Sequence, residues 1–363
     1  MRHHRLPSTL AASVVALALA AGAAACGDDD DGDTGSEDRA ETVTVRMLTH
    51  DSFVVSDEVL EAFTDRTGIE VELLQGGDTG TVVNQAILTK GAPQADVLFG
   101  IDSTLLTRGL DEDLFVPYES PELVNVDPRF VLDPEHRVTP VDYGDVCINY
   151  DKAWFAERGI PVPQSLEELV DPRYRDLLVV EDAASSSPGL AFLLATIAHF
   201  GEAGWQGWWA DLRENGVQVV DSWEDAYNAA FSGGAASQGT RPLVVSYASS
   251  PPVEVVYADP PVTDPPTGVI EAGCYRQVEL AGILRGTDHE REARQVIDFL
   301  LSEPFQADVP LSMFVFPVRE GTPLPDVFER FAARPADVVE VDPFALGERR
   351  DDLLRRWRDV VVG

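Results

Sequence analysis

Aromatic residues in this sequence recur where strands are expected to end and helices to begin. Trp223 and Tyr227 lie four residues apart in "SWEDAYNAA", and Tyr247 ends the apolar run "LVVSY". Phe314 lies in "SMFVFPV" near the end of the chain. Aromatic faces attract organic cations by roughly 0.5–2 kcal/mol each, depending on desolvation. These four rings therefore predict a site for a flat or cationic organic ligand, although each ring alone is equally explained by core packing.

Polar residues follow the same expected strand ends. Asp51 and Asp102 each come after an apolar strand and could supply negative charge to a cationic ligand. "SSSPGL" places Ser185, Ser186, Ser187 and Gly189 at the start of an expected helix, with Ser187 as its cap. Free N–H groups at a helix start suit a hydroxyl or phosphate oxygen. Ordinary helix capping accounts for the same residues, so both interpretations stay open.

Motifs of known catalysis are absent from the sequence. It contains no HExxH, no GxSxG and no GxxxxGK phosphate-binding loop, and its histidines are scattered. We therefore expect no catalytic residues, no metal and no cofactor.

The elements that must position these residues form an α/β pattern. Expected strands at 43–50, 69–75 and 95–102 alternate with helices, which favours a largely parallel sheet. Two long extended segments, near 141–150 and 274–285, bracket a middle block of alternating elements. The simplest geometry is two lobes joined by two crossing strands, with strand ends facing one cleft. Lobe I is expected to comprise 42–144 and 278–363, and lobe II 145–277.

The net charge and the N-terminus predict an exported protein. A net charge of −36 disfavours nucleic acid and anionic membranes as partners and attracts cations. Basic residues precede an apolar stretch ending in "AAAC", so we expect a signal peptide over 1–25. "AAAC" is similar to a bacterial lipobox, which predicts lipidation of Cys26 and a flexible acidic tether over 26–41. In an oxidising compartment the remaining Cys147 and Cys274 could pair.

The whole mature sequence resembles the thiamine-binding periplasmic proteins of bacterial ABC importers. The matching stretches are "DSF", "ADVLFGIDSTLL", "DYGDVCINYDK", "PQSLEELVD", "SSSPGLAFLLAT", "SWEDAYNAAFSGG", "LVVSYASSP", "YRQVELAGIL" and "FVFPV". The resemblance implies a two-lobed periplasmic-binding-protein-like fold of type II. It also implies a monomer that is anchored by lipid outside the cytoplasm and delivers thiamine, or its phosphates, to permease and ATPase subunits.

The resemblance also assigns roles to residues. It implies that Trp223, Tyr227 and Tyr247 pack around the ligand rings, that Asp51 and Asp102 are the acidic positions, and that Ser185–Gly189 meets the hydroxyl or phosphate end. A tryptophan common in the family is Phe314 here, which implies weaker stacking. Cys147 and Cys274 depart from the family pattern, and their places in the crossing strands imply a disulfide across the hinge.

Two alternatives remain at this stage. A cysteine-type thiaminase resembles the same fold, and it would use Cys147 as nucleophile and Glu279 as base. A binding protein for another solute, such as ferric ion or a polyamine, is the second alternative. Iron sites of this superfamily use a tyrosine pair, whereas "SYAS" supplies one tyrosine.

Overall fold

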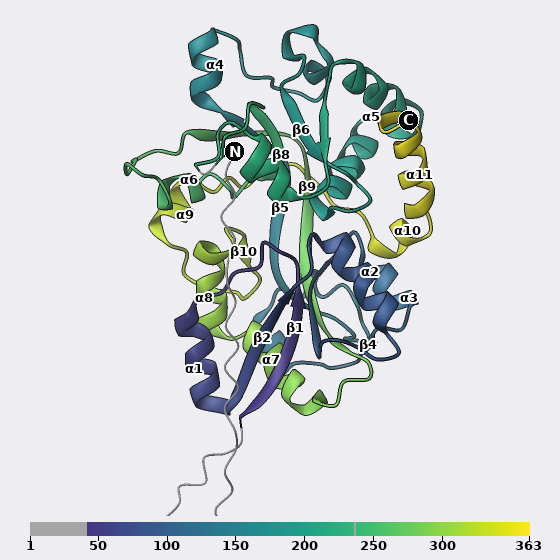
Figure 1. Cartoon of the computed structure of the whole chain (residues 1–363), viewed down its shortest axis with the longest axis vertical. Coiled ribbons are helices and arrows are strands. Elements are labelled where there is room, and N and C mark those ends of the chain that lie inside the picture. The colour runs from purple at the N-terminus through teal and green to yellow at the C-terminus, as the bar shows by residue number, and fades with distance from the viewer. Residues whose placement is uncertain (1–41, 236) are drawn as a thin grey trace, which may run out of the picture. The chain divides into compact units, whose positions relative to one another are not determined.

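A mixed β-sheet runs through the part of the chain that the computed structural model describes, residues 42–235 and 237–363 (Figure 1). The expected signal peptide, Cys26 and the acidic tether lie outside the described residues. The sheet has 11 strands within the described ranges. In chain order they are β1 (Val43–Thr49), β2 (Ile69–Gln75), β3 (Val97–Asp102), β4 (Phe115–Val116), β5 (Thr139–Asp151), β6 (Leu178–Glu181), β7 (Gln218–Val220), β8 (Leu243–Tyr247), β9 (Thr267–Leu284), β10 (Phe316–Pro317) and β11 (Val338–Val339).

Two long antiparallel strands join two parallel groups of strands. The order along the sheet is β2-β1-β3-β9-β5-β8-β6-β7, with β4 and β11 paired to β9 and β10 paired to β5. The pairs β1–β2, β1–β3, β6–β7 and β6–β8 are parallel, as the alternating pattern predicts. β5 and β9 pair from Thr139 opposite Ala281 to Asp151 opposite Thr267. These are the two crossing strands expected from the sequence, although β9 begins earlier than expected.

Helices cover the sheet. They are α1 (Asp57–Thr67), α2 (Thr79–Thr89), α3 (Leu106–Asp111), α4 (Lys152–Arg158), α5 (Ser187–Glu214), α6 (Val253–Val256), α7 (Glu290–Leu300), α8 (Glu303–Ser312), α9 (Asp326–Phe331), α10 (Pro343–Gly347) and α11 (Arg350–Val361). Short 3₁₀ turns are η1 (Pro121–Asn125), η2 (Pro128–Phe130), η3 (Glu167–Val170) and η4 (Pro172–Tyr174), and η5 (Asp225–Ala230) is a π-helix.

The C-terminal helix α11 packs along α5, as Figure 1 shows. The rings of Trp209 and Trp357 meet edge to face with centroids 5.6 Å apart, and Arg356 pairs with Glu202. Residues Glu41–Gly363 form one compact unit, so the expected lobe boundaries stay a prediction. The segment 278–363 was expected in lobe I, but its last helix, α11, packs on α5, which was expected in lobe II. The apolar face of α11 is buried in this contact.

Among the described residues, none of the helices combines the length and the apolar composition that crossing a membrane requires.

Candidate ligand-binding site

The strand ends enclose a cleft with a volume of about 370 Å³. Segments that are distant in sequence line it: the end of β1, the start of α2, the turn before η5, the end of β8, the middle of β9 and the loop after α8. Protein sites for small ligands commonly have volumes of about 300–1,000 Å³. The cleft therefore has the size and the place in the fold that the sequence predicts for a ligand site.

Three rings, Trp223, Tyr227 and Tyr247, line the cleft and are called here the aromatic wall. Trp223 and Tyr227 stack with centroids 5.1 Å apart and an interplanar angle of 15°. The intervening turn is a π-helix, in which Phe231 N–H bonds to the Ala226 carbonyl five residues back. The wall is therefore built largely by one local segment.

Hydrogen bonds hold the polar atoms of the aromatic wall. The indole N–H of Trp223 donates to Ser246 Oγ (2.9 Å), and the Tyr227 hydroxyl donates to Glu254 (2.9 Å). The Tyr247 hydroxyl donates to Gln277 at 3.3 Å. A Cβ at Gly144 would lie 2.6 Å from the Tyr247 ring, so this ring needs glycine on the neighbouring strand β5. Protein partners thereby hold the indole N–H and both tyrosine hydroxyls.

Acidic residues of three neighbouring strands lie side by side behind the cleft. Glu279 on β9 is directly opposite Asp102 on β3 and Asp142 on β5. His50, just after β1, places Nε2 at 3.3 Å from Glu279 Oε1, an ion-pair contact rather than an aligned hydrogen bond. We call these four residues (His50, Asp102, Asp142 and Glu279) the acidic cluster. Only His50 and Glu279 of the cluster line the cleft.

Burial and mutual repulsion shift the pKa values in the acidic cluster. Burial raises the pKa of Asp102 to about 7, against hydrogen bonds from Thr104 that lower it. Burial, and then the charge of Glu279, raise the pKa of Asp142 well above its usual value. Burial alone lowers the pKa of His50, but the charges of Glu279, Asp78 and Asp51 raise it overall. The carboxyl groups of Asp102 and Asp142 and the imidazole of His50 therefore stay protonated to higher pH than usual.

Asp78 links α2 to the segments across the cleft. Its carboxylate caps α2 at the Thr79 N–H (2.7 Å) and also accepts from the Ser187 N–H (3.2 Å) and the Trp223 N–H (3.0 Å). Burial raises the pKa of Asp78, while hydrogen bonds from Trp223, Ser186 and Ser187 lower it in part. Ser52 adds a second link by donating to Glu224 at 3.0 Å.

The structure brings some of the expected site residues to the cleft and leaves others away from it. Asp51 and the aromatic wall line it, as does Phe314. Asp102 is fully buried and does not line it; it accepts from Thr104 and pairs with the Ser187 hydroxyl. A buried carboxylate needs such partners, and Thr104 and Ser187 supply them. Ser185, Ser186, Ser187 and Gly189 do not line the cleft either, and only Pro188 of that segment does.

The start of α5 differs from the expectation in a second way. The helix begins at Ser187, and Ser186 rather than Ser187 is the residue before it, without a side-chain cap. The Ser185 hydroxyl donates to the Asp221 carbonyl at 2.7 Å. A Cβ at Gly189 would lie 2.7 Å from the Glu181 carbonyl, so Gly189 faces β6. These residues therefore support the segments beside the cleft.

Phe314 enters the cleft from the loop between α8 and β10. Its φ of 56° lies in the left-handed region, which bulky side chains rarely adopt and which is concentrated at functional sites. Its ring meets Tyr257 edge to face at 5.9 Å. The strained backbone aims Phe314 at Tyr257, so that the two rings close one side of the cleft.

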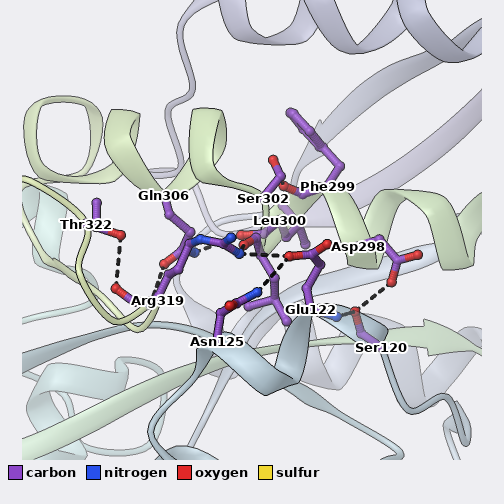
Figure 2. A network of polar contacts seen from close by, with 11 residues as sticks. Ser120, Glu122, Asn125, Asp298, Phe299, Leu300, Ser302, Gln306, Arg319 and Thr322 are labelled. Carbon is purple, nitrogen blue, oxygen red and sulfur yellow. Dashed lines mark hydrogen bonds and ion pairs between the residues drawn. The ribbon is translucent and has the colours of Figure 1, made fainter.

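A polar network, shown in Figure 2, includes Gln306 on α8 and Arg319, which follows β10. Gln306 on α8 donates to the Val141 carbonyl (2.8 Å) and accepts from the Arg319 N–H (3.0 Å). The Arg319 guanidinium donates to Glu122 at 2.8 Å. The segments before and after the Phe314 loop are therefore tied to β5 and to η1.

Several cleft residues were missed as binding residues by sequence reasoning. They are His50, Ser52, Asp78, Glu224, Ser250, Glu254, Tyr257 and Glu279. His50 follows β1 as Asp51 does, and Asp78 follows β2 in a Gly-rich turn. Their positions just after strands are therefore a sequence signal by which both could have been predicted. Glu279 lies within β9 and carries no such signal.

Cys147 and Cys274 form a disulfide between β5 and β9, with Cα atoms 4.5 Å apart, so this expectation is confirmed. A thiaminase-like nucleophile would require a free, accessible thiol at Cys147. This cysteine is bonded and fully buried, so the structure contradicts that alternative.

Within residues 42–235 and 237–363, no group of three or more His, Cys, Asp or Glu side chains is arranged to hold a metal ion.

Comparison with known proteins identifies the family of the chain. A family model described as bacterial extracellular solute-binding protein matches residues 92–334. The thiamine-binding periplasmic protein of Escherichia coli (strain K12) is 28% identical over 320 residues, covering 87% of this chain and 92% of that protein.

Solved structures show the same fold. A structure titled periplasmic thiamin binding protein matches with a TM-score of 0.75 and 25% identity, covering 88% of this chain and 96% of that one. Iron-bound HitA from Pseudomonas aeruginosa matches with a TM-score of 0.69 and 22% identity, covering 88% and 99%. The expected type II periplasmic-binding-protein fold is thereby confirmed. With two thirds of its length matched by the family model, the chain belongs to the bacterial extracellular solute-binding proteins.

Proposed function

We propose that this chain captures thiamine in the cleft and delivers it to the permease of an ABC importer. The observation that carries the proposal is that the aromatic wall and several carboxylates line one cleft. The printed names of the relatives in Escherichia coli and among solved structures support the choice of thiamine.

The chemistry of thiamine suits both sides of the cleft. Its thiazolium ring is a permanent cation, and its aminopyrimidine ring is flat and polar. The aromatic wall offers ring faces to both, at roughly 0.5–2 kcal/mol for each cation–π contact. Glu279, Glu224 and Asp51 line the same space and offer countercharge. Carboxylates next to a desolvated cation also exclude anionic solutes of similar size.

Individual roles follow from these positions. Trp223, Tyr227, Tyr247 and Phe314 contact the ligand rings, and Asp51 contributes charge. Asp102 and the segment Ser185–Gly189 act indirectly: Asp102 pairs with Ser187, and Asp78 joins Ser187 to Trp223. Closure of the cleft about β5 and β9 would bring both sides onto the ligand.

Isothermal titration tests the proposal directly. We expect the purified protein to bind thiamine, and to bind putrescine and ferric citrate much more weakly. Tighter binding of either competitor would contradict the proposal, as would absence of thiamine binding to protein whose fold is confirmed by circular dichroism.

The N-terminal sequence extends the proposal to anchoring. Removal of residues 1–25 would leave Cys26 as the lipidated first residue, with 26–41 as tether for a monomer outside the cytoplasm. We expect mass spectrometry of the mature protein to find a lipid on Cys26 as its first residue. A mature protein that starts elsewhere, or that carries no lipid on Cys26, would contradict the lipid anchor, and size-exclusion chromatography checks the monomer.

A further inference from the structure

His50 is the only basic side chain among the described residues that line the cleft. Its Nε2 lies 3.3 Å from Glu279 Oε1, and the two side chains are only 12% and 11% exposed. The cleft is otherwise acidic, and the carboxylates that line it are Asp51, Asp78, Glu224, Glu254 and Glu279. A cation that enters the cleft therefore meets in Glu279 a carboxylate that already has a basic partner.

Packing against β3 holds the imidazole of His50 in this place. A Cβ at Gly100 would lie 2.5 Å from His50 Cδ2, so the ring rests directly on the backbone of β3. The rings of Phe53 and Phe99 lie beside the imidazole, with centroids 6.5 and 5.7 Å from it. Nε2 is buried and has no hydrogen-bond partner among the described residues. The charge of Glu279 is therefore the interaction that this nitrogen has in the cleft.

The groups that face Glu279 from the neighbouring strands give it no positive partner. Asp102 on β3 and Asp142 on β5 are opposite Glu279 in the strand register, and both are fully buried. No N–H or O–H group of the described residues donates to either oxygen of Asp142. Burial, and then the charge of Glu279, raise the pKa of Tyr247 well above its usual value, so this hydroxyl stays uncharged. His50 is thus the group that supplies a positive charge beside Glu279 when it is protonated.

The charge of His50 changes in the pH range in which proteins work. Burial lowers the pKa of His50, but the charges of Glu279, Asp78 and Asp51 raise it overall. His50 is therefore still mostly protonated at pH 6.5, its ordinary pKa, and it loses its proton at higher pH. Where His50 is protonated, the protein itself neutralises Glu279, and where His50 is neutral, Glu279 lacks a positive partner.

We propose that protonated His50 and the cation of the ligand are alternative partners of Glu279, so that the cleft takes up the cation in exchange for a proton. The inference rests on the proposed function and adds a residue that controls binding at the same site. In the exchange the imidazolium of His50 loses one proton to the solvent, and the total charge of the occupied cleft equals that of the empty one. Two positive charges beside one buried carboxylate repel each other, so the proton and the ligand each weaken the binding of the other.

Isothermal titration of the whole protein with thiamine at about pH 6 and at about pH 8.5 tests the exchange. The thiazolium charge is permanent, so the change of pH acts on the protein. We expect thiamine to bind about 30-fold more tightly at the higher pH, where the competing proton is absent. In His50→Gln, which is polar and uncharged, this difference should fall to about threefold. The remainder comes from Asp102, because burial raises its pKa to about 7, within the same range.

Imidazole NMR titration of His50 gives a reciprocal measurement on the wild-type protein. Linkage requires thiamine to lower the proton affinity of His50 by the factor by which the proton lowers the affinity for thiamine. We expect saturation with thiamine to lower the pKa of His50 by about one pH unit, the equivalent of about tenfold. A purely structural role of His50 would leave its pKa unchanged by the ligand.

His199→Gln is the matched control. His199 also pairs with a glutamate, with Nε2 at 2.7 Å from Glu167 Oε1, but neither residue lines the cleft. The control should keep the wild-type difference in affinity between the two pH values.

Equal wild-type affinity at both pH values, or tighter binding at the lower one, would overturn the inference and leave thiamine binding intact. A His50→Gln variant that keeps the full wild-type difference would overturn the role of His50. Absence of thiamine binding at either pH, by protein whose fold is confirmed by circular dichroism, would instead contradict the proposed function. If His50→Gln does not fold, the NMR titration decides, and a His50 pKa that thiamine does not lower would overturn the exchange.

Discussion

The aromatic wall and the acidic cluster meet at the same cleft but are built in opposite ways. The wall comes from one stretch of chain, with Trp223 and Tyr227 stacked along a single turn and Tyr247 on the next strand. The cluster comes from four distant segments, and strand register alone brings Asp102, Asp142 and Glu279 together. The wall consists of uncharged rings whose polar atoms form hydrogen bonds. In the cluster, burial and neighbouring negative charge raise the pKa values of Asp102 and Asp142. Ring affinity and charge selection thus reside in separate regions.

Removing the Cys147–Cys274 bridge should have the largest effect. It joins β5 and β9, which carry Asp142 and Glu279, across a separation of 127 residues. We expect the double change Cys147→Ser and Cys274→Ser to lower the free energy of unfolding by about 2–5 kcal/mol, measured by chemical denaturation. Reduction of the wild-type bridge should reproduce the loss, and a loss below about 1 kcal/mol would show that the bridge adds little to this hinge.

The pH dependence of stability should separate the acidic cluster from the rest of the protein. Burial raises the pKa of Asp102 to about 7 in the folded state. Between its ordinary pKa and about 7 the folded state therefore holds a proton that the unfolded state has lost. Stability from this group is present at low pH and is lost as the pH rises through that window. We expect Asp102→Asn to remove this loss and to stabilise the protein near pH 8 by on the order of a few kcal/mol.

Asp133 is a control, because its pKa shift has the opposite sign to that of Asp102. It is fully buried, and although burial raises its pKa, hydrogen bonds from Arg137 lower it overall. Its contribution to stability is present near neutral pH and is lost on acidification, so Asp133→Asn should destabilise the protein at neutral pH. Thermal unfolding at a series of pH values measures both variants. Parallel pH profiles for Asp102→Asn and the wild type would refute the cluster's role.

Trp223→Ala should weaken thiamine binding by about 2 kcal/mol, roughly 30-fold. The change removes one ring of the aromatic wall and, with it, the ring on which Tyr227 stacks. Trp154→Ala is the matched control, since Trp154 stacks under Arg158 and does not line the cleft. Isothermal titration measures both. Equal losses in the two variants would remove the aromatic wall from ligand binding.

Glu279→Gln should have the smallest effect of the four, about tenfold in thiamine affinity, because one of several carboxylates is neutralised. It should also lower the pKa of His50, which the charge of Glu279 raises. Imidazole NMR titration measures that pKa. Glu340→Gln is the control, since Glu340 is an exposed partner of Arg276. A His50 pKa that does not move would show that the pair is not coupled.

The sequence by itself determined the α/β alternation, the two crossing strands and the aromatic wall. These depend on local features: apolar runs that recur at strand length, and rings placed at the ends of such runs. The wall could be found because Trp223 and Tyr227 lie in one short turn and Tyr247 ends an apolar run, and both positions can be read from the local sequence.

Only the tertiary structure decided three features. They are the burial of Asp102, the hydrogen bonds that Asp78 accepts from the starts of both α2 and α5, and the packing of α11 on α5. Each depends on which distant residues become neighbours. Strand register sets Glu279 against two other carboxylates, and a buried charge must find partners wherever the fold offers them. The register between two strands leaves no periodic mark in either strand, so the sequence could predict that β5 and β9 cross but not which of their residues face each other.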